Sequence, residues 1–591
     1  METSFQEFGA VSDRRRRDLE LRRRSRNVRI GGAVTVVLLV AIVGAVYALY
    51  SPEKDAAKQS RAVTIDQFHT TGKSVETLCA STDYRQTCVS SLNKAVKNTT
   101  DPKYLVKAAV FVLLDEASAA FNRTRLLADK DPKLRGGVED CRQLFEDSKD
   151  EIRRAVESIA ADGIEKIPAK SHDIRTWLSS VMSYQQTCID GFPEGELKVK
   201  LQKAQNTLKE MTSNSLAIIG QLSNFLEMLD VTGLGVGGGR KLLAETVEIG
   251  GEEFPSWLPE QSRRVLRETE IKLKANVTVA KDGSGDFKTI SEALLNMPSK
   301  YHGRYNIYVK AGVYEETVNV TRKMANVTIY GDGATETIVT GDKNFVDGVR
   351  TFLTATFSVS GDGFMGINIG IRNTAGAVKH QAVALRVQSD HSIFFHCRFE
   401  GYQDTLYAQA KRQFYRSCVI SGTVDFIFGD SAAVFQNCLI VLRRPLDNQQ
   451  NIVLAHGRVD RRETTGFVLH KCKIIADRSL VSDGTNIRSY LGRPWKQFAR
   501  HIIMESEISG AIVPAGYMPW EGDFGLNTLF YGEAGNTGPG ADFAGRVKWR
   551  GVRILKNTTV ERYTVARFIQ GNEWINANRG ITIPVRYGLY H

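Results

Sequence analysis

The stretch that decides the fold runs from Ser392 to Ile440 and reads SIFFHCRFEGYQDTLYAQAKRQFYRSCVISGTVDFIFGDSAAVFQNCLI. The motif around Cys397 recurs in outline around Cys418 and again around Cys438, at spacings of 21 and then 20 residues. The intervening runs alternate, are rich in β-branched and aromatic residues, and are separated by Gly, Asp and Ser without helical periodicity. Self-similarity at so short a period indicates stacked coils, each unable to bury its apolar face alone. The stretch therefore predicts a parallel β-helix in which residues one period apart lie one above the other, on strands about 4.8 Å apart.

Two acidic residues follow the same period. Asp404 and Asp425 are 21 residues apart, so we expect them at equivalent positions of adjacent coils, and Gln381 and Gln403, 22 apart, lie on nearly the same line. Two carboxylates roughly 5 Å apart cannot both ionise freely, so the pair can divide into an acid and a base or nucleophile. A lone Asp is more often a solvated turn residue. Here Asp425 lies inside the apolar run VDFIF, where an unpaired charge is costly, and this favours a functional role.

Four sequence blocks resemble the signature motifs of plant pectin methylesterases. They read HQAVALR (380–386), GYQDTLY (401–407), GTVDFIFG (422–429) and LGRPW (491–495). The similarity extends from about residue 275 to the C-terminus, and several long blocks in the same order make it specific. The resemblance implies an enzyme, a pectinesterase (EC 3.1.1.11), which hydrolyses the methyl esters of homogalacturonan to give demethylated pectin and methanol. It implies a catalytic domain over 271–591 that is all-β, a right-handed parallel β-helix.

The resemblance also implies roles for individual residues. Asp425 is the expected nucleophile, which forms an acyl-enzyme anhydride, and Asp404 is the expected proton donor to methanol and then the base that activates water. Gln403 and Gln381 are expected to stabilise the developing oxyanion, with Gln403 the stronger candidate because it adjoins Asp404. Arg493 can hold Asp425 ionised and aligned through a charge-assisted hydrogen bond.

Substrate binding is expected from residues that line the same cleft: Thr351, Gln381, Arg493 and Trp495, the last with a flat apolar face for a sugar ring. A Ser-His-Asp triad is disfavoured, although His380 and His396 suggest one, because the repeat contains no Gly-x-Ser-x-Gly elbow at a strand–helix turn. No His or Cys cluster has the spacing of a zinc site, so neither a metal nor a cofactor is expected.

The N-terminal segment has the features of a membrane anchor. Nine arginines lie in a basic tail over residues 1–29, and residues 30–50 are 21 residues without a charge, long enough to span a bilayer. A cleavable signal peptide is the alternative, but its apolar region is usually shorter and nearer to the N-terminus. Arginines before the span place the N-terminus in the cytoplasm. We therefore expect a type II signal anchor, a single transmembrane helix, that directs the chain into the secretory pathway.

Residues 61–230 are predicted to form an all-α domain, because apolar residues there fall at helical spacing. Four cysteines in a lumenal protein suggest two disulfides, and three connectivities are possible. Cys79–Cys88 is the natural local pair, which leaves Cys141–Cys188. The sequence around these cysteines resembles the invertase and pectin methylesterase inhibitor domain, and we predict a four-helix bundle tied by two disulfides.

The linker over 231–270 is rich in glycine and is predicted to be cut. Its motifs RKLL (240–243) and RRVL (263–266) resemble the dibasic processing sites of pectin methylesterases with a pro-region. Exposed, Gly-rich linkers are where proteolysis concentrates, so a processing subtilisin-like protease is an expected partner. Before cleavage, tethering raises the effective concentration of the bundle to about the millimolar range. The bundle is then either a pro-region that covers the cleft or a folding and targeting module without inhibitory contacts.

Disulfide geometry in the β-helix leaves two pairings open. Cys418 and Cys438 are one coil apart and within bridging range, and Cys397 could pair with Cys418 by the same geometry. The family resemblance implies the Cys418–Cys438 bridge and leaves Cys397 and Cys472 as packed thiols.

The net charge of +12 fits an acidic polymer as partner. Nucleic acid is not expected, because the chain shows none of the usual motifs for it. Six Asn-x-Ser/Thr sequons, at Asn98, Asn122, Asn276, Asn319, Asn326 and Asn557, agree with a secreted protein of the cell wall or apoplast. Expected partners are methyl-esterified pectin, the intramolecular pro-domain, separate inhibitor proteins and, before processing, the membrane. Two alternatives are a β-helix polysaccharide depolymerase and an inactive inhibitor or wall-binding protein.

Overall fold

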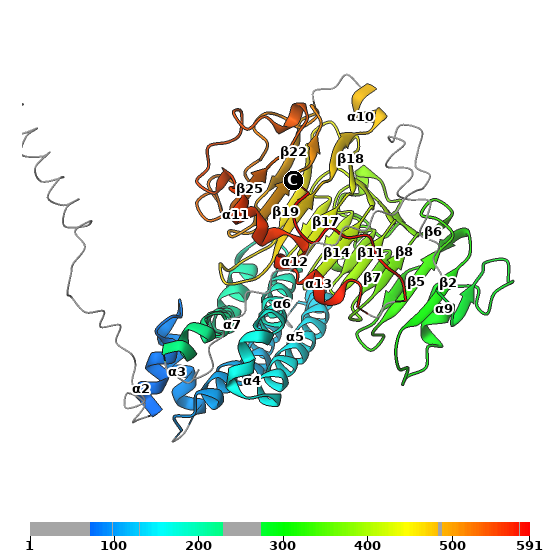
Figure 1. The fold of residues 1–591 in the computed structure, drawn as a ribbon. Coiled ribbons are helices and arrows are strands. Elements are labelled where there is room, and N and C mark those ends of the chain that lie inside the picture. Colours follow the sequence, from blue (N-terminus) through cyan, green and yellow to red (C-terminus); the bar gives the residue numbers. More distant parts are fainter. Residues whose placement is uncertain are drawn as a thin grey trace, which may run out of the picture. The chain divides into compact units, whose positions relative to one another are not determined.

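The computed structural model describes residues 71–96, 99–128, 131–228, 273–482, 487–577 and 580–590. This part of the chain holds a helical region followed by a long stack of strands (Figure 1). The basic tail, the anchor over 30–50 and the processing linker over 231–270 that the sequence predicts lie outside the described residues. Among the helices that the structure describes, none combines the length and the apolarity needed to cross a bilayer.

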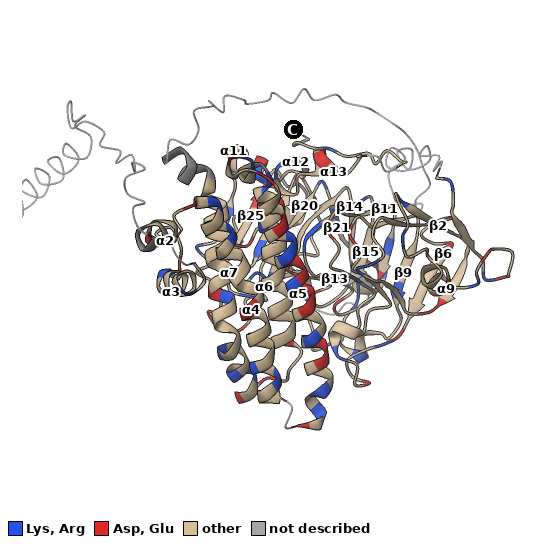
Figure 2. Cartoon of the chain, turned by 90° about the horizontal axis from the view of Figure 1, so that it is seen from below, with Lys and Arg blue, Asp and Glu red and all other residues tan. Residues whose placement is uncertain are grey.

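The N-terminal region is a bundle of helices. Its elements are α2 (Thr71–Cys79), α3 (Arg85–Ala95), α4 (Pro102–Ala128), α5 (Arg135–Ala161), α6 (Ser171–Asp190) and α7 (Glu196–Met228), with the short 3-10 helices η2 (Pro132–Leu134) and η3 (Ile164–Lys170). The long helices α4 to α7 lie side by side and enclose fully buried apolar residues such as Leu113, Ile152, Leu178 and Leu208. Acidic residues recur along α5 (Figure 2). Helical periodicity therefore identified this region correctly.

The C-terminal region is a parallel β-helix of three sheets. The 11-stranded sheet A contains β1 (Val277–Val279), β2 (Tyr305–Val309), β5 (Val327–Gly331), β8 (Met365–Ile367), β11 (Ser392–Phe395), β14 (Arg412–Arg416), β17 (Ala432–Gln436), β20 (Gly466–His470), β23 (Arg500–Met504), β25 (Phe530–Ala534) and β26 (Val552–Ile554). The 8-stranded sheet B contains β3 (Gly312–Glu315), β6 (Thr337–Gly341), β9 (Gly370–Asn373), β12 (Arg398–Glu400), β15 (Val419–Gly422), β18 (Leu439–Leu442), β21 (Lys473–Ala476) and β24 (Glu507–Ile508). The 7-stranded sheet C contains β4 (Val318–Val320), β7 (Phe357–Val359), β10 (Leu385–Val387), β13 (Leu406–Ala408), β16 (Ile427–Gly429), β19 (Asn451–His456) and β22 (Ser489–Arg493).

One left-handed residue turns the chain from sheet A to sheet B in six successive coils. It is the first residue after each sheet A strand, and its φ lies between 50° and 56°: Asn368, His396, Ser417, Asn437, Lys471 and Glu505. A single residue in this conformation gives a sharp corner without an added loop. The repeat that the sequence shows around Cys397, Cys418 and Cys438 is this corner, and the paired strands confirm its period.

The interior of the coil is filled by stacked side chains. Phe394, Tyr415 and Phe435 occupy successive coils, with ring centroids 5.1 Å and then 4.6 Å apart. All three are fully buried, and they belong to one apolar core that runs along the whole stack. Burial of aromatic and aliphatic area of this kind is the main stabilising contribution to the coil.

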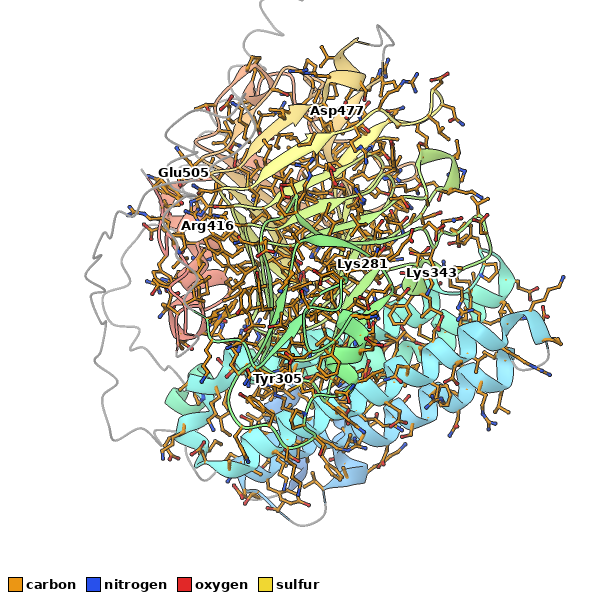
Figure 3. The ribbon with its side chains drawn as sticks, turned by 90° about the vertical axis from the view of Figure 1, so that its right-hand side faces the viewer. Lys281, Tyr305, Lys343, Arg416, Asp477 and Glu505 are labelled. Atoms are coloured by element: carbon orange, nitrogen blue, oxygen red, sulfur yellow. A yellow bond between two sulfur atoms is a disulfide. The ribbon has the colours of Figure 1, made fainter. Side chains whose placement is uncertain are left out.

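A second apolar layer covers the outer face of sheet A. The C-terminal segment, with α11 (Asn557–Val560), η7 (Glu561–Tyr563), α12 (Val565–Phe568) and α13 (Gly571–Trp574), packs Val565, Ile569 and Trp574 onto this face. Arg416 and Glu505 lie on the same side of the β-helix (Figure 3), where Glu505 accepts a hydrogen bond from the Tyr590 backbone at 2.9 Å. The remaining short helices are α9 (Ile290–Leu295), α10 (Arg478–Ser482), η4 (Thr351–Leu353), η5 (Ala377–Lys379) and η6 (Pro539–Ala541).

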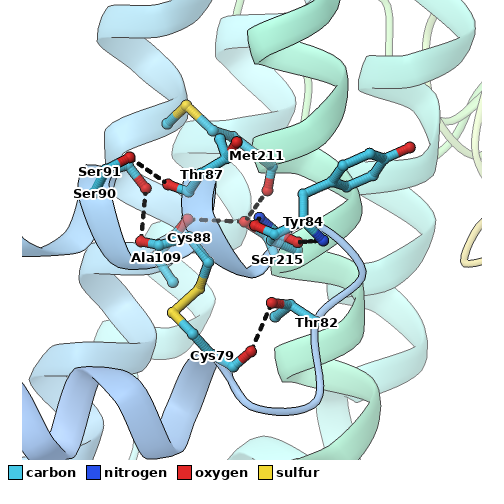
Figure 4. Close-up of a disulfide and its surroundings, with 11 residues drawn as sticks. Cys79, Thr82, Tyr84, Thr87, Cys88, Ser90, Ser91, Ala109, Met211 and Ser215 are labelled. Atoms are coloured by element: carbon cyan, nitrogen blue, oxygen red, sulfur yellow. Dashed lines mark hydrogen bonds between the residues drawn. A yellow bond between two sulfur atoms is a disulfide. The ribbon is translucent and has the colours of Figure 1, made fainter.

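The cysteines give one confirmed and one wrong prediction. Both bundle disulfides are present, Cys79–Cys88 joining α2 to α3 (Figure 4) and Cys141–Cys188 joining α5 to α6. The predicted Cys418–Cys438 bridge is absent, and the four β-helix cysteines are buried free thiols. Their sulfur atoms donate instead to main-chain carbonyls, that of Cys418 to Phe394 at 3.3 Å and that of Cys438 to Tyr415 at 3.4 Å. In parallel, in-register strands such side chains point inward side by side, so adjacency in the stack did not imply a bond.

Candidate functional site

Asp404 and Asp425 occupy equivalent positions on neighbouring coils. Each lies two residues before a strand of sheet C, and the register pairs Leu406 with Ile427. Both aspartates have a positive φ, 64° and 50°, a conformation that Asp adopts more readily than most residues. Only 7% and 6% of their surfaces are exposed. The period read from the sequence thus brought two carboxylates together at one buried turn.

Arg493 holds the Asp425 carboxylate. The guanidinium donates from Nε to Oδ1 at 2.8 Å and from NH2 to Oδ2 at 2.5 Å, a bidentate ion pair. Arg493 ends β22, two strands from β16 in sheet C. Its guanidinium also lies over the ring of Trp520, 4.3 Å from the centroid. Packing against the indole fixes the plane of the guanidinium, and therefore the orientation of the carboxylate that it holds.

Asp404 lies in a different electrostatic environment. Burial raises the pKa of its carboxyl well above the ordinary value, and the nearby Asp425 carboxylate raises it further, while Arg493 opposes both effects. No hydrogen bond to a described side chain compensates this burial in the way that Arg493 compensates Asp425. The pair therefore divides into a carboxylate held by a cation and a carboxyl that favours its protonated form.

The residues that the sequence singled out line one cavity. Its volume is about 420 Å³, and Asp404, Asp425, Gln381, Gln403, Arg493, Thr351 and Trp495 all contribute to its wall. Neither His380 nor His396, which suggested a triad, is among the lining residues. Burial, and next the charge of Arg416, lower the pKa of His396 to about 3, so this imidazole is neutral. In the described part of the chain, no group of three or more His, Cys, Asp or Glu side chains is arranged to hold a metal ion.

Sequence reasoning missed several lining residues of the β-helix. Tyr407 and Phe428 stack with ring centroids 4.3 Å apart and form part of the cavity wall. They are 21 residues apart, so the period that located the aspartates was a signal for them too. Trp520 lies in an irregular segment and carried no such signal. Two cations, Arg350 and Lys496, also line the cavity and were overlooked beside recognised motifs.

The helical bundle contributes the rest of the wall. Its lining residues are Thr187, Asp190, Gly191, Glu194 and Lys198, at and just after the C-terminal end of α6. The Thr187 hydroxyl lies 3.1 Å from the Tyr407 hydroxyl, and Lys496 donates from Nζ to the Asp190 carboxylate at 2.7 Å. Ser183, one turn earlier on α6, donates to the carbonyl oxygen of Gln409 at 2.8 Å. The bundle therefore contacts the β-helix at the cavity itself.

Together the fold and the site define a parallel β-helix protein with a paired-carboxylate centre, preceded by a helical domain. The model of the Pectinesterase family matches residues 276–572, and that of the Plant invertase/pectin methylesterase inhibitor family matches residues 73–218. The chain belongs to the pectinesterase family. It is a pectinesterase (EC 3.1.1.11), an enzyme that hydrolyses the methyl esters of pectin, and it carries an inhibitor-like pro-domain.

Individual relatives are similar over nearly the whole chain. The pectinesterase/pectinesterase inhibitor 45 of Arabidopsis thaliana is 43% identical over 99% of this chain and 100% of its own length. Pectinesterase 3 of Phaseolus vulgaris is 39% identical over 89% of this chain and 88% of its own length. Among solved structures, the pectin methylesterase from carrot is 48% identical with a TM-score of 0.53, and it covers 54% of this chain and 99% of that chain. The carrot structure therefore matches the β-helix as a separate folded protein.

Proposed function

We propose that the hydrolysis proceeds by two steps through a covalent intermediate on Asp425. The Asp425 carboxylate attacks the carbonyl carbon of the methyl ester, and protonated Asp404 gives its proton to the departing methoxy oxygen, which leaves as methanol. An anhydride then joins the galacturonate carbonyl to Asp425. In the second step the Asp404 carboxylate takes a proton from water, the hydroxide attacks the anhydride, and Asp425 is released together with a galacturonate carboxylate.

The division of the acid pair is the observation that carries this proposal. A nucleophile must be ionised, and Asp425 is bound at both oxygens by Arg493. A proton donor must be protonated at the working pH, and burial raises the pKa of Asp404. The amides of Gln403 and Gln381 are neutral donors in the same cavity, which suits stabilisation of an oxyanion between two acids. Thr351 and Trp495 supply polar and apolar surface for the sugar units.

The test is methanol release from methyl-esterified pectin by residues 267–591, with Asp425→Asn beside the unchanged domain. We expect methanol from the first and at most a trace from the second. Reducing ends or unsaturated ends without methanol would instead indicate a depolymerase. Methanol release by Asp425→Asn at the unchanged rate would contradict the assignment of the nucleophile.

We also propose that the helical domain is an autoinhibitor, removed by proteolysis in the linker. In support, α6 hydrogen-bonds Tyr407 in the cavity wall through Thr187, and Asp190 binds Lys496 next to Trp495. A chain of sugar units cannot occupy the cavity while these contacts persist. The test compares the full chain with residues 267–591 and then adds the separate bundle. Equal rates for both proteins, and an unchanged rate at high micromolar bundle, would exclude inhibition.

The remaining proposals concern the fold in detail and the route to the wall. We propose a right-handed coil, a four-helix bundle and a type II membrane precursor whose processing releases the enzyme into the apoplast. The free Arg-rich tail before an uncharged span supports the orientation. Mass mapping of the secreted protein would test it, since an N-terminus near Arg267 is expected.

A further inference from the structure

The contact between bundle and β-helix is polarised by charge. Bundle carboxylates pair with β-helix cations at seven described positions: Asp83, Asp140, Asp147, Asp150, Glu151, Asp173 and Asp190. The opposite arrangement, in which a bundle cation pairs with a β-helix carboxylate, occurs among described side chains in Arg154–Asp362. The bundle thus presents a mainly anionic face to a mainly cationic one, and acidic positions along α5 contribute to it (Figure 2).

Five of the β-helix cations are paired only through the bundle. Within the described residues, the ion pairs of Arg322, Arg350, Arg461, Arg462 and Lys496 all end on bundle carboxylates. Other cations at the contact differ, because Lys411 also binds Asp362, and Arg412 also binds Asp390, within the β-helix. Release of the bundle would leave the five without a carboxylate. Cations retained without an internal partner indicate an anionic ligand.

Arg350 and Lys496 are the two of these five that line the catalytic cavity. Arg350 leads through η4 into β7, and Lys496 follows β22. In sheet C, β7 lies two strands from β13, which carries Asp404, and β22 lies two strands from β16, which carries Asp425. With about 4.8 Å between strands, the two cations belong to coils on the order of 10 Å to either side of the acid pair. A polymer that runs along the coil axis over the acids would pass both.

The substrate chemistry tells which groups such cations distinguish. A methyl-esterified galacturonate unit is neutral, whereas each turnover leaves a unit with a free carboxylate. A guanidinium or ammonium group binds a carboxylate by a charge-assisted hydrogen bond and gains nothing comparable from an ester. Asp140 binds Arg350 through both side-chain oxygens, and Asp190 binds Lys496, so each cation already holds a carboxylate in this structure.

We propose that Arg350 and Lys496 bind the free carboxylates of demethylated galacturonate units on either side of the ester under attack. Asp140 and Asp190 occupy these positions while the bundle is in place. The inference rests on the proposed function only in that the bundle leaves the cavity before catalysis. The enzyme then selects esters whose neighbours are already demethylated, so that its product directs the next event to the adjacent stretch of chain.

The experiment compares two substrates on residues 267–591, the part that the carrot relative spans as a separate protein. One substrate is fully methyl-esterified pectin and the other is pectin partly demethylated by alkali. The unchanged domain should show the lower KM on the partly demethylated substrate. Arg350→Gln and Lys496→Gln should each raise that KM about three- to tenfold more than the KM on the fully esterified substrate, as expected for the loss of one half-buried ion pair. The value of kcat should change less than KM.

Two further variants make the result specific. Arg350→Lys keeps the charge and should retain most of the preference for the partly demethylated substrate. Lys548→Gln removes a cation whose described partner is the Ala544 carbonyl, away from the cavity, and should leave the ratio of the two KM values unchanged. Equal rises in KM on both substrates, an unchanged ratio, or the same loss in Lys548→Gln would overturn the proposal. Because the bundle is absent from this assay, failure of autoinhibition would leave the result readable.

Discussion

The β-helix and the bundle place their functional residues in different ways. In the β-helix, a fixed period carries each side chain to a defined position, so Asp404, Gln403 and Asp425 meet because their numbers differ by one coil. In the bundle, the residues at the cavity come from the end of one helix whose position depends on packing against three others. The comparison teaches that the reacting groups belong to a rigid repeat, whereas the groups that cover them belong to a separable domain with its own core.

Loss of the nucleophile should have the largest effect on the β-helix side of this comparison. Asp425→Asn keeps the side-chain shape but cannot form the acyl intermediate, so kcat should fall on the order of 10⁴-fold or more. Methanol release measures the rate, and circular dichroism checks that the coil persists. Asp477→Asn, in an exposed position outside the cavity, is the matched control and should retain activity.

Loss of a bundle disulfide should destabilise the helical domain alone. Cys141 and Cys188 close a loop with a sequence separation of 47 residues, so Cys141→Ser should cost the bundle about 4 kcal/mol of unfolding free energy. Thermal unfolding of the full chain should then show an earlier bundle transition and an unchanged β-helix transition. A simultaneous shift of both transitions would mean that the two regions unfold as one unit.

Removal of one buried charge should loosen the cover without touching the chemistry. Glu151 is fully buried and binds Lys411 at 2.6 Å and Arg322 at 2.8 Å, both on the β-helix. Glu151→Gln should therefore weaken binding of the separate bundle on the order of 10²-fold and raise the activity of the full chain. Glu157→Gln, an exposed position on the same helix, is the control and should bind as before.

The smallest expected effect is a gain in stability at the active site. The pKa of Asp404 is raised on folding, so its folding penalty is absent below the unfolded value near 4 and is fully present above the folded value. Asp404→Asn removes this penalty and should raise Tm at pH 7 by about 2–4 °C while activity falls 10²-fold or more. Below pH 4 the two proteins should unfold at the same temperature. A lower Tm for the variant at pH 7 would show that Asp404 stabilises the fold.

The sequence predicted those features that follow from a period or from a motif. The 21-residue spacing of Asp404 and Asp425 predicted their register, and the apolar run around Asp425 predicted a buried charge with a partner. Trp520 could not be predicted, because its approach to Arg493 depends on the path of an irregular segment. The wrong Cys418–Cys438 bridge has a related cause, since spacing places two sulfur atoms near each other but does not decide whether they bond.

The one-residue corner between sheets A and B also bears on how length changes are tolerated. An extra residue at Ser417 or Asn437 would move the following side chains of the strand to the opposite face of the sheet, from interior to solvent. The connections from sheet B to sheet C run over residues 401–405, 423–426 and 443–450, so their lengths already differ between coils. Insertions and deletions can therefore accumulate along the edge that borders the cavity, while the opposite corner stays fixed. Relatives can diversify the substrates that they accept by loop length alone, without redesigning the coil.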